Sequence, residues 1–226
     1  MRILPLGDRA IQVVLGDAPD EPTRLRVAAA RARLAARRIP GVVECLAGFT
    51  TLTVHYELES ERAYRIVAAA VEAALAGAQA AEAEEGERLV EIPVCYGGGQ
   101  GPDLALVAAH AGMTPEEVIA THSGAEYRVH FLGFIPGFPY LVGLDPRLTT
   151  PRRDTPRTAV PAGSVGIGGV QTGVYPMESP GGWQLIGRTP LRLFDPHATP
   201  PALLHPGDRV RFRPVDAAEL ARLESA

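Results

Sequence analysis

The sequence predicts an α+β protein in which a small ferredoxin-like α/β domain (residues 1–87) is followed by a closed β-barrel domain (88–226). The first observation behind this prediction is compositional, because residues 1–90 hold only 4 of the 21 Pro and 6 of the 24 Gly. The second is the hydrophobic pattern, which has strand and helix periods in the first half and breaks into short apolar runs in the second. The acidic stretch 82–87 lies at this change and is expected to form an exposed linker.

The elements expected in the first half follow the order β-α-β-β-α-β, which is typical of a ferredoxin-like sandwich. They are a strand at 11–15, a helix at 23–38, a hairpin of strands at 42–46 and 50–56, a helix at 64–78 and a strand at 89–94. The last strand is also compatible with the second domain. The first helix is expected to bury one apolar stripe. That stripe consists of Leu25, Ala28, Ala32, Ala36 and Ile39.

The second half is expected to be mostly β-structure with many turns. Its clearest helix start is at Thr114, where Thr is the cap, Pro115 lies in the first turn and Glu117 completes a capping box. Alternating apolar residues predict strands at 127–131 and 209–213. The short apolar runs between them, separated by Gly and Pro, favour a closed barrel over an open sheet.

The basic residues are all arginine, since the chain has 22 Arg, no Lys and also no Asn. Without lysine there is no Schiff-base nucleophile, no pyridoxal-phosphate aldimine and no P-loop of the G-x-x-x-x-G-K type. A net charge of −4 argues against nucleic acid or an anionic membrane as a partner. Cys45 and Cys95 fit a reducing compartment, and no targeting or membrane-spanning segment is recognised, so a cytoplasmic protein is expected.

The densest stretch of unusual residues runs from Tyr127 to Pro190. Its first segment extends from His130 to Tyr140, where three Phe and one Tyr are interleaved with Gly and Pro. Because proline lacks a ladder donor, this segment cannot be a regular central strand. It is either a rigid turn with buried rings or an aromatic lip around a ligand or partner, with Phe134 and Phe138 as candidates. His130 is an acid–base candidate, although a strand histidine is more often a structural residue.

Four arginines follow at close spacing, with prolines between them. They are Arg147, Arg152, Arg153 and Arg157. Proline keeps this segment extended, and guanidinium groups match carboxylates and phosphates in geometry. The segment is therefore either an anion site or a solvated loop, whose exposed ion pairs contribute about 0–1 kcal/mol each.

The segment 160–176 is rich in glycine and contains Gly163, Ser164, Gly166 and Gln171. Its backbone is suited either to close approach of a ligand with N–H donors or to a pair of bulged strands in a tight barrel wall. It matches neither a dinucleotide fingerprint nor a nucleophile elbow.

The sole tryptophan, Trp183, follows Gly181-Gly182, which is expected to form a turn that places the ring at the start of a strand. The six histidines show no i, i+2 or i, i+4 pairing, and neither cysteine has a neighbouring ligand. The sequence therefore predicts no metal site.

Five runs between His130 and Pro190 resemble the signature of a bacterial family. Its members are called the B subunit of 5-oxoprolinase, sporulation-kinase inhibitor and allophanate hydrolase subunit 1. The five runs are residues 131–141, 151–153, 160–167, 171–173 and 179–183. The segments 6–10 and 92–97 also look like features of this family, so the resemblance covers nearly the whole chain. It implies a small α/β domain followed by a cyclophilin-like β-barrel.

The resemblance also implies a function. Members of this family act beside a carboxyltransferase-like partner subunit, and with a third lactam-utilisation subunit the complex hydrolyses 5-oxo-L-proline to L-glutamate at the expense of ATP. Since the chain has no nucleotide motif, ATP is expected to be held mainly by a partner. The alternatives are inhibition of histidine-kinase autophosphorylation and urea or allophanate chemistry. A peptidyl-prolyl isomerase would rest on fold analogy alone.

Residue chemistry assigns expected roles within the signature. Arg152, Arg153 and Arg157 are expected to neutralise carboxylate or phosphoryl charge, with Arg153 acting in catalysis. The backbone of residues 163–169 is expected to supply N–H donors. The other candidates are His130 for proton transfer, Phe134, Phe138 and Trp183 as pocket walls, and Gly163, Ser164, Gly166 and Gln171 for substrate binding.

Overall fold

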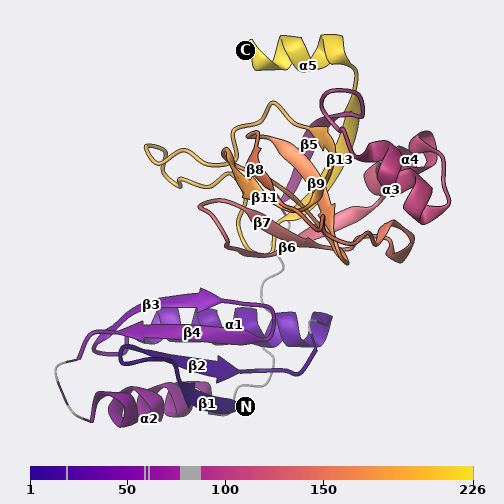
Figure 1. The fold of residues 1–226 in the computed structure, drawn as a ribbon. Coiled ribbons are helices and arrows are strands. Elements are labelled where there is room, and N and C mark those ends of the chain that lie inside the picture. Colours follow the sequence, from indigo (N-terminus) through magenta and orange to yellow (C-terminus); the bar gives the residue numbers. More distant parts are fainter. Residues whose placement is uncertain (19, 59, 61, 77–87, 226) are drawn as a thin grey trace. The chain divides into compact units, whose positions relative to one another are not determined.

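The computed structural model describes residues 1–226 except 19, 59, 61, 77–87 and 226. The chain divides into two compact units, residues 1–85 and 86–226 (Figure 1). The predicted linker 82–87 and the predicted boundary after residue 87 lie outside the described residues. Across the described ranges, every helix is too short or too polar to span a bilayer.

The first unit is a four-stranded antiparallel sheet with two helices packed against it (Figure 1). In chain order its elements are β1 (Arg2–Pro5), β2 (Ala10–Val14), α1 (Glu21–Arg37), β3 (Val42–Ala47), β4 (Thr51–Tyr56) and α2 (Ala63–Leu75). The strand order is β1-β2-β4-β3. Alternate side chains of β2 and β4 form the core with both helices, and this core includes Ile11, Val13, Leu52, Val54 and Tyr56.

In a ferredoxin-like sandwich, the strand that follows the second helix lies at one edge of the sheet. In this structure β1 occupies that edge. The sequence left the strand at 89–94 open between the two domains, and the structure assigns it to the barrel as β5 (Leu89–Tyr96). The edge is filled from the N-terminus instead, with Ile3 opposite Val13. Four residues are too few for an alternating pattern to be recognised, and β1 was therefore not predicted.

Helix α1 turns a different face toward the core than the predicted apolar stripe, although Ile39 of that stripe packs against the core. The residues that pack into the core are Val27, Ala30 and Leu34. Valine and leucine bury more apolar area than the alanines of the predicted stripe, so they decide which face turns inward. Beside them Arg24 is 5% exposed, with its guanidinium paired to Glu21.

The second unit is a closed barrel of seven strands in the order β10-β7-β6-β13-β5-β12-β9. Its elements are β5 (Leu89–Tyr96), α3 (Leu104–Ala111), α4 (Pro115–Gly124), β6 (Glu126–Leu132), β7 (Pro139–Val142), the 3₁₀ helix η1 (Pro146–Leu148), β8 (Arg157–Val160), β9 (Ser164–Gly168), β10 (Gln171–Val174), β11 (Ser179–Gly181), β12 (Gln184–Arg188), β13 (Arg209–Val215) and α5 (Ala217–Glu224). Parallel pairing of β5 with β13 joins residues 89–95 to 209–215. The predicted fold class, an α+β chain with a barrel in its second half, is confirmed.

Local predictions in this unit also hold. The capping box is present, because Glu117 N donates to Thr114 Oγ1 at 3.2 Å and Thr114 N donates to Glu117 Oε2 at 2.7 Å. The glycine-rich segment forms the β9–β10 hairpin. Outside the barrel, β8 and β11 pair in a separate two-stranded ribbon.

Helix α4 brings a histidine into the barrel core. His122 is fully buried, and its Nε2 lies 2.9 Å from Thr172 Oγ1. The Thr172 hydroxyl donates to the Gly166 carbonyl at 3.0 Å, so His122 Nε2 is the donor and its Nδ1 accepts from Tyr96 Oη at 2.8 Å. Burial lowers the pKa of His122 to about 3, so this ring is neutral and ties α4 to three barrel strands.

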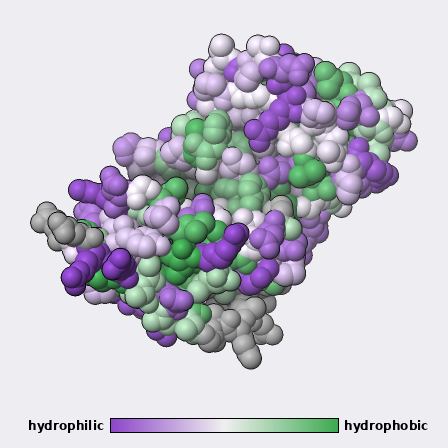
Figure 2. All heavy atoms as spheres, turned by 60° about the horizontal axis from the view of Figure 1, so that its bottom comes forward, coloured by the Kyte–Doolittle hydropathy of each residue, from purple (hydrophilic) through white to green (hydrophobic). Residues whose placement is uncertain are grey.

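On the face shown in Figure 2, apolar residues lie between hydrophilic ones.

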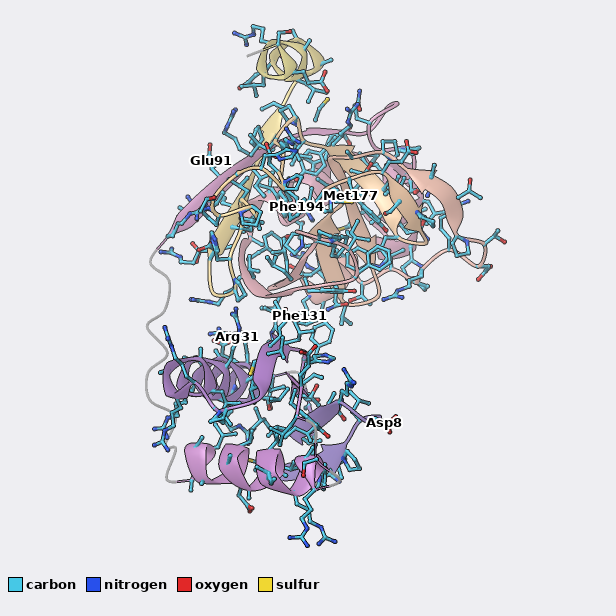
Figure 3. All side chains as sticks on the ribbon, turned by 90° about the vertical axis from the view of Figure 1, so that its left-hand side faces the viewer. Asp8, Arg31, Glu91, Phe131, Met177 and Phe194 are labelled. Carbon is cyan, nitrogen blue, oxygen red and sulfur yellow. The ribbon has the colours of Figure 1, made fainter. Side chains whose placement is uncertain are left out.

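Glu91 lies on the outside of β5 (Figure 3), where its carboxylate is 3.0 Å from Arg213. Arg213 also contacts Glu219 at 2.9 Å, so this ladder fastens α5 to the barrel wall.

Candidate functional site

A buried carboxylate organises the arginine segment that the sequence singled out. Asp103, just before α3, is 6% exposed, and its Oδ2 accepts from the Leu185 amide at 2.7 Å. Its Oδ1 accepts from Arg157 Nη2 at 2.8 Å and lies 3.5 Å from Arg153 Nη1. The carboxylate of Asp103 thus holds two guanidinium groups. Arg153 lies in the segment before β8, and Arg157 is the first residue of β8.

The charges at this carboxylate do not balance. Two guanidinium groups share one anion, which leaves a surplus positive charge on side chains that are 35% (Arg153) and 22% (Arg157) exposed. Within the described part of the chain, Arg153 Nε and Arg157 Nη1 are buried and have no hydrogen-bond partner. Buried donors are rarely left unsatisfied, so this cluster is suited to an additional acceptor or anion.

The backbone of the arginine segment is fixed from the barrel side. Arg153 N donates to the Gly182 carbonyl at 2.7 Å, and Gln184 Nε2 donates to the Pro151 carbonyl at 2.9 Å. Between these anchors, the Arg152 guanidinium carbon lies 5.9 Å from the centre of the Trp183 ring. Hydrogen bonds and a cation–π contact therefore hold the segment as a rigid frame.

The Trp183 ring needs a glycine behind it. A Cβ at Gly168 would lie 2.6 Å from Trp183 Nε1 and Cδ1, so only glycine leaves room for the indole. On its other sides the ring meets Phe138 edge-to-face at 5.4 Å and Tyr140 at 6.3 Å. The glycine-rich strand β9 thus acts as the wall against which the aromatic cluster packs.

A surface pocket of about 470 Å³ lies beside this frame. Its lining combines two arginines with hydroxyl, amide, imidazole and carboxylate groups. The lining residues are Leu106, His110, Thr150, Pro151, Arg152, Arg153, Asp154, Thr155 and Gln184. Cations and neutral donors dominate this set, so the pocket is suited to a small anion that also forms hydrogen bonds.

The structure brings some of the predicted site residues together and separates others. Arg152 and Arg153 line the pocket, Arg157 shares their carboxylate, and Trp183 lies under Arg152. Phe138 packs against Trp183 but is 2% exposed. These five residues form one contiguous cluster.

Of the predicted site residues only Arg152 and Arg153 line this pocket, and His130 and Phe134 are among those that lie elsewhere. His130 is 6% exposed on β6, and its ring stands edge-on to Phe131 at 5.7 Å. Phe131 itself lies at the margin of the barrel unit (Figure 3). Phe134 contacts Phe138 at 5.6 Å, while most of its ring is exposed.

The predicted N–H donors of the glycine-rich segment are engaged within the barrel. Gly163 N donates to the Tyr175 carbonyl at 2.7 Å and Ser164 N donates to the Pro161 carbonyl at 3.2 Å. Gly166 and Gln171 pair across the β9–β10 hairpin with Gly173 and Gly168. This segment therefore contributes to the site through its shape and its lack of side chains.

Sequence reasoning missed Asp103, Gln184 and His110. Asp103 lies 54 positions from Arg157, and its only local signal is a Gly-Pro-Asp turn before a helix. Gln184 follows the sole Trp, and His110 lies near the end of α3 without a partner histidine at helical spacing. Among the described residues there is no cluster of three His, Cys, Asp or Glu that could hold a metal ion.

Comparison with known proteins gives named relatives. The chain is 47% identical over 220 residues to the B subunit of 5-oxoprolinase from Bacillus subtilis, covering 93% of this chain and 91% of that protein. It is 50% identical over 185 residues to the B subunit of 5-oxoprolinase from Escherichia coli O157:H7, covering 80% and 83%.

Solved structures show the same fold within longer chains. The crystal structure of TTHA0988 matches 93% of this chain with a TM-score of 0.77 and 37% identity. This chain spans only 40% of that protein. The K. lactis urea amidolyase matches 97% of the chain with a TM-score of 0.76 and 23% identity, and the match covers 15% of that enzyme.

The family assignment rests on most of the chain. Residues 1–204 match the family described as carboxyltransferase domain, subdomain C and D. This range contains the sheet of the first unit, the Asp103–Arg157 cluster and the glycine-rich hairpin. The chain therefore belongs to the carboxyltransferase-domain family, in its subdomain C and D group.

Proposed function

We propose that this protein is a subunit of an ATP-dependent 5-oxoprolinase, which hydrolyses 5-oxo-L-proline to L-glutamate. Its relatives at 47% and 50% identity are named as the B subunit of 5-oxoprolinase, and such a name implies a complex of several chains. The single observation that carries the proposal is the pair of guanidinium groups on one buried carboxylate, next to a pocket lined by Arg152 and Arg153.

The substrate matches this pocket in chemistry. 5-Oxoproline carries a carboxylate, a lactam N–H donor and a lactam oxygen, and the lactam carbon is a poor electrophile. Arg152 and Arg153 supply charge for the carboxylate or for a phosphoryl group, because guanidinium binds both. Thr150, Thr155 and Gln184 add neutral hydrogen-bonding groups to the same lining.

Activation by ATP gives a balanced route. The lactam oxygen takes the γ-phosphoryl group, and ADP leaves with the electrons of the broken P–O bond. Water then adds to C5, the C5–N bond breaks as the ring nitrogen takes a proton, and a second water releases phosphate from the resulting acyl phosphate. Negative charge develops at the oxygen and phosphoryl group, where fixed arginine charge lowers the barrier. His110 is the imidazole that the pocket lining offers for proton transfer.

The complex is expected to contain a carboxyltransferase-like partner subunit and a third lactam-utilisation subunit. ATP is assigned mainly to a partner, because this chain contains no lysine and no nucleotide motif. The cytoplasm is the expected compartment, since both cysteines are free thiols. The likeness to urea amidolyase, at 23% identity, is a likeness of fold alone.

The test is co-expression with both partner subunits, followed by an assay of ATP-dependent glutamate release from 5-oxoproline. Arg153→Ala should lower kcat/KM by about 10–100-fold, as expected for one lost charge-assisted hydrogen bond, while the complex still assembles. Arg192→Ala is the matched control, because Arg192 is an exposed arginine paired with Asp195 at 3.1 Å, and it should leave turnover unchanged. A complete complex without activity would refute the proposed reaction.

A further inference from the structure

The turn between β6 and β7 holds an exposed phenylalanine in an unusual backbone conformation. Phe134 has φ +68°, in the left-handed region that L side chains seldom adopt. Ile135 N donates to the Gly133 carbonyl at 2.8 Å, so Phe134 is the central residue of a γ-turn with positive φ, a rare and strained form. Glycine would adopt this conformation at lower cost.

The strained turn is also rigid. Gly133 N donates to the Phe138 carbonyl at 3.1 Å, and Phe138 N donates to the Ile135 carbonyl at 3.1 Å. Gly137 packs so closely on Phe194 that a Cβ would lie 2.8 Å from the Phe194 Cβ. A ring presented on such a turn loses little conformational entropy when it binds another surface.

Within this chain the phenylalanine ring gains little from its position. Phe134 is 61% exposed, whereas Phe138 and Trp183 of the same aromatic cluster are 2% and 5% exposed. Its ring contacts Phe138 edge-to-face at 5.6 Å, with an interplanar angle of 85°. Strained residues cluster at active sites, ligand clamps and switch regions, so an exposed strained residue points to a role in binding.

The exposed ring is continuous with the arginine pocket. Phe134 touches Phe138, Phe138 meets Trp183 at 5.4 Å, and Arg152 lies over Trp183 at 5.9 Å. A partner surface that covers Phe134 would therefore be linked through Phe138 and Trp183 to Arg152, which lines the pocket. Phe138 and Trp183 thus connect the docking site to the anion pocket.

The chemistry of the segment indicates an apolar partner surface. Residues 131–144 contain no charged side chain. Large aromatic anchors on rigid backbone are enriched among the residues that dominate protein–protein binding energy. The relatives are named as a subunit, and the 37% identical TTHA0988 carries this region as two fifths of a longer chain. Both findings point to another subunit as the occupant rather than a second copy of this chain.

We propose that Phe134 is the anchor by which this protein docks into an apolar pocket of the carboxyltransferase-like subunit. The choice of that partner rests on the proposed function, whereas the anchor role rests on the geometry of the turn. Residues 133–137 are then a docking turn, and partner binding covers the aromatic cluster beside the arginine pocket.

The test uses the purified chain and the purified carboxyltransferase-like subunit, with the dissociation constant measured by isothermal titration calorimetry. Phe134→Ala should raise Kd by at least about 30-fold, the effect expected of a dominant interface residue. Phe134→Leu, which keeps an apolar side chain, should recover part of the loss. Val170→Ala is the matched control, because Val170 is 70% exposed in the same barrel outside the turn, and it should change Kd less than about 2-fold.

Two measurements separate docking from a purely structural role and from other partners. The isolated Phe134→Ala chain should keep its melting temperature within a few degrees, and a large drop would make Phe134 a structural cover for Phe138. An unchanged Kd for the carboxyltransferase-like subunit would overturn the proposal. The proposal would also fail if Phe134→Ala weakened binding only to a histidine-kinase domain or to a second copy of this chain. If the complex forms through Phe134 but releases no glutamate, the docking inference stands and the proposed reaction fails.

Discussion

The carboxylate of Asp103 and the guanidinium of Arg157 are joined at 2.8 Å across 54 positions of the chain, and Arg153 approaches the same oxygen at 3.5 Å. This relationship fixes the extended segment before β8 against the start of α3. It also places surplus positive charge beside the pocket that Arg153 lines. The stability of the segment and its capacity for anions therefore depend on one acidic residue.

Asp103→Asn should lower the free energy of unfolding of the barrel unit by about 2–4 kcal/mol, because two guanidinium groups lose their anion in a mostly buried site. The lower end allows for Arg153, whose side chain is 35% exposed. In the variant, the side-chain oxygen of the asparagine still accepts a hydrogen bond from the Leu185 amide. Urea denaturation measures the change. Asp154→Asn removes an exposed carboxylate of the same segment and should change stability by less than about 0.5 kcal/mol. Equal effects of the two changes would contradict the assigned role.

Gly168→Ala should displace the sole tryptophan. The new Cβ would lie 2.6 Å from the Trp183 ring, and forcing a methyl group into a packed core costs about 1–3 kcal/mol. Intrinsic fluorescence reports the event directly, and the emission of the variant should shift to the red as the ring moves toward water. Gly99→Ala is the control, because nothing lies within 4 Å of the Cβ position at Gly99. An unshifted spectrum with wild-type stability would show that the wall tolerates a side chain.

Much of the fold follows from local sequence, and the parts that failed depend on distant contacts. The hairpin at β3 and β4, the helix α2 and the capping box at Thr114 are set by neighbours within a few residues. The placement of β5 was left open because its partner β13 lies about 120 residues further along the chain. Helix α1 turned differently because side-chain size, rather than spacing, decided its buried face.

The candidate site was predictable in its residue types but not in its connections. Closely spaced arginines near proline indicate an anion site at any position, so Arg152 and Arg153 could be named. Their carboxylate could not, because Asp103 reaches them only through barrel closure. Histidines carry no such local signal, and so the buried His122 and the pocket-lining His110 were passed over in favour of His130.

Acid should destabilise the barrel unit through His122. Burial lowers the pKa of this ring to about 3 in the folded state, from about 6.5 in the unfolded chain. Between these values the unfolded state binds one more proton, so stability falls as the pH falls below about 6.5, by about 2 kcal/mol at pH 5. Urea denaturation at pH 7.5 and pH 5 measures this loss.

Two variants identify the group responsible for that loss. His122→Gln should be less stable at neutral pH but should lose less of its remaining stability on acidification. His197→Gln, which replaces an exposed histidine, should keep the wild-type pH dependence. A wild-type pH slope in His122→Gln would assign the loss to other groups.

Inorganic phosphate should bind the isolated chain at the arginine pocket, with a signal that Trp183 reports. Arg152 lies 5.9 Å from the indole centre, so an anion that draws this guanidinium away alters the surroundings of the ring. A saturable change in tryptophan emission is expected, and it should weaken steeply with added salt because the attraction is electrostatic. Arg153→Ala should raise Kd for phosphate by about 10–100-fold, the value of one charge-assisted hydrogen bond. Arg192→Ala should leave the Kd for phosphate unchanged. Equal losses of affinity in both variants would mean that phosphate binding depends on the net charge of the chain and that the pocket is not a specific phosphate site.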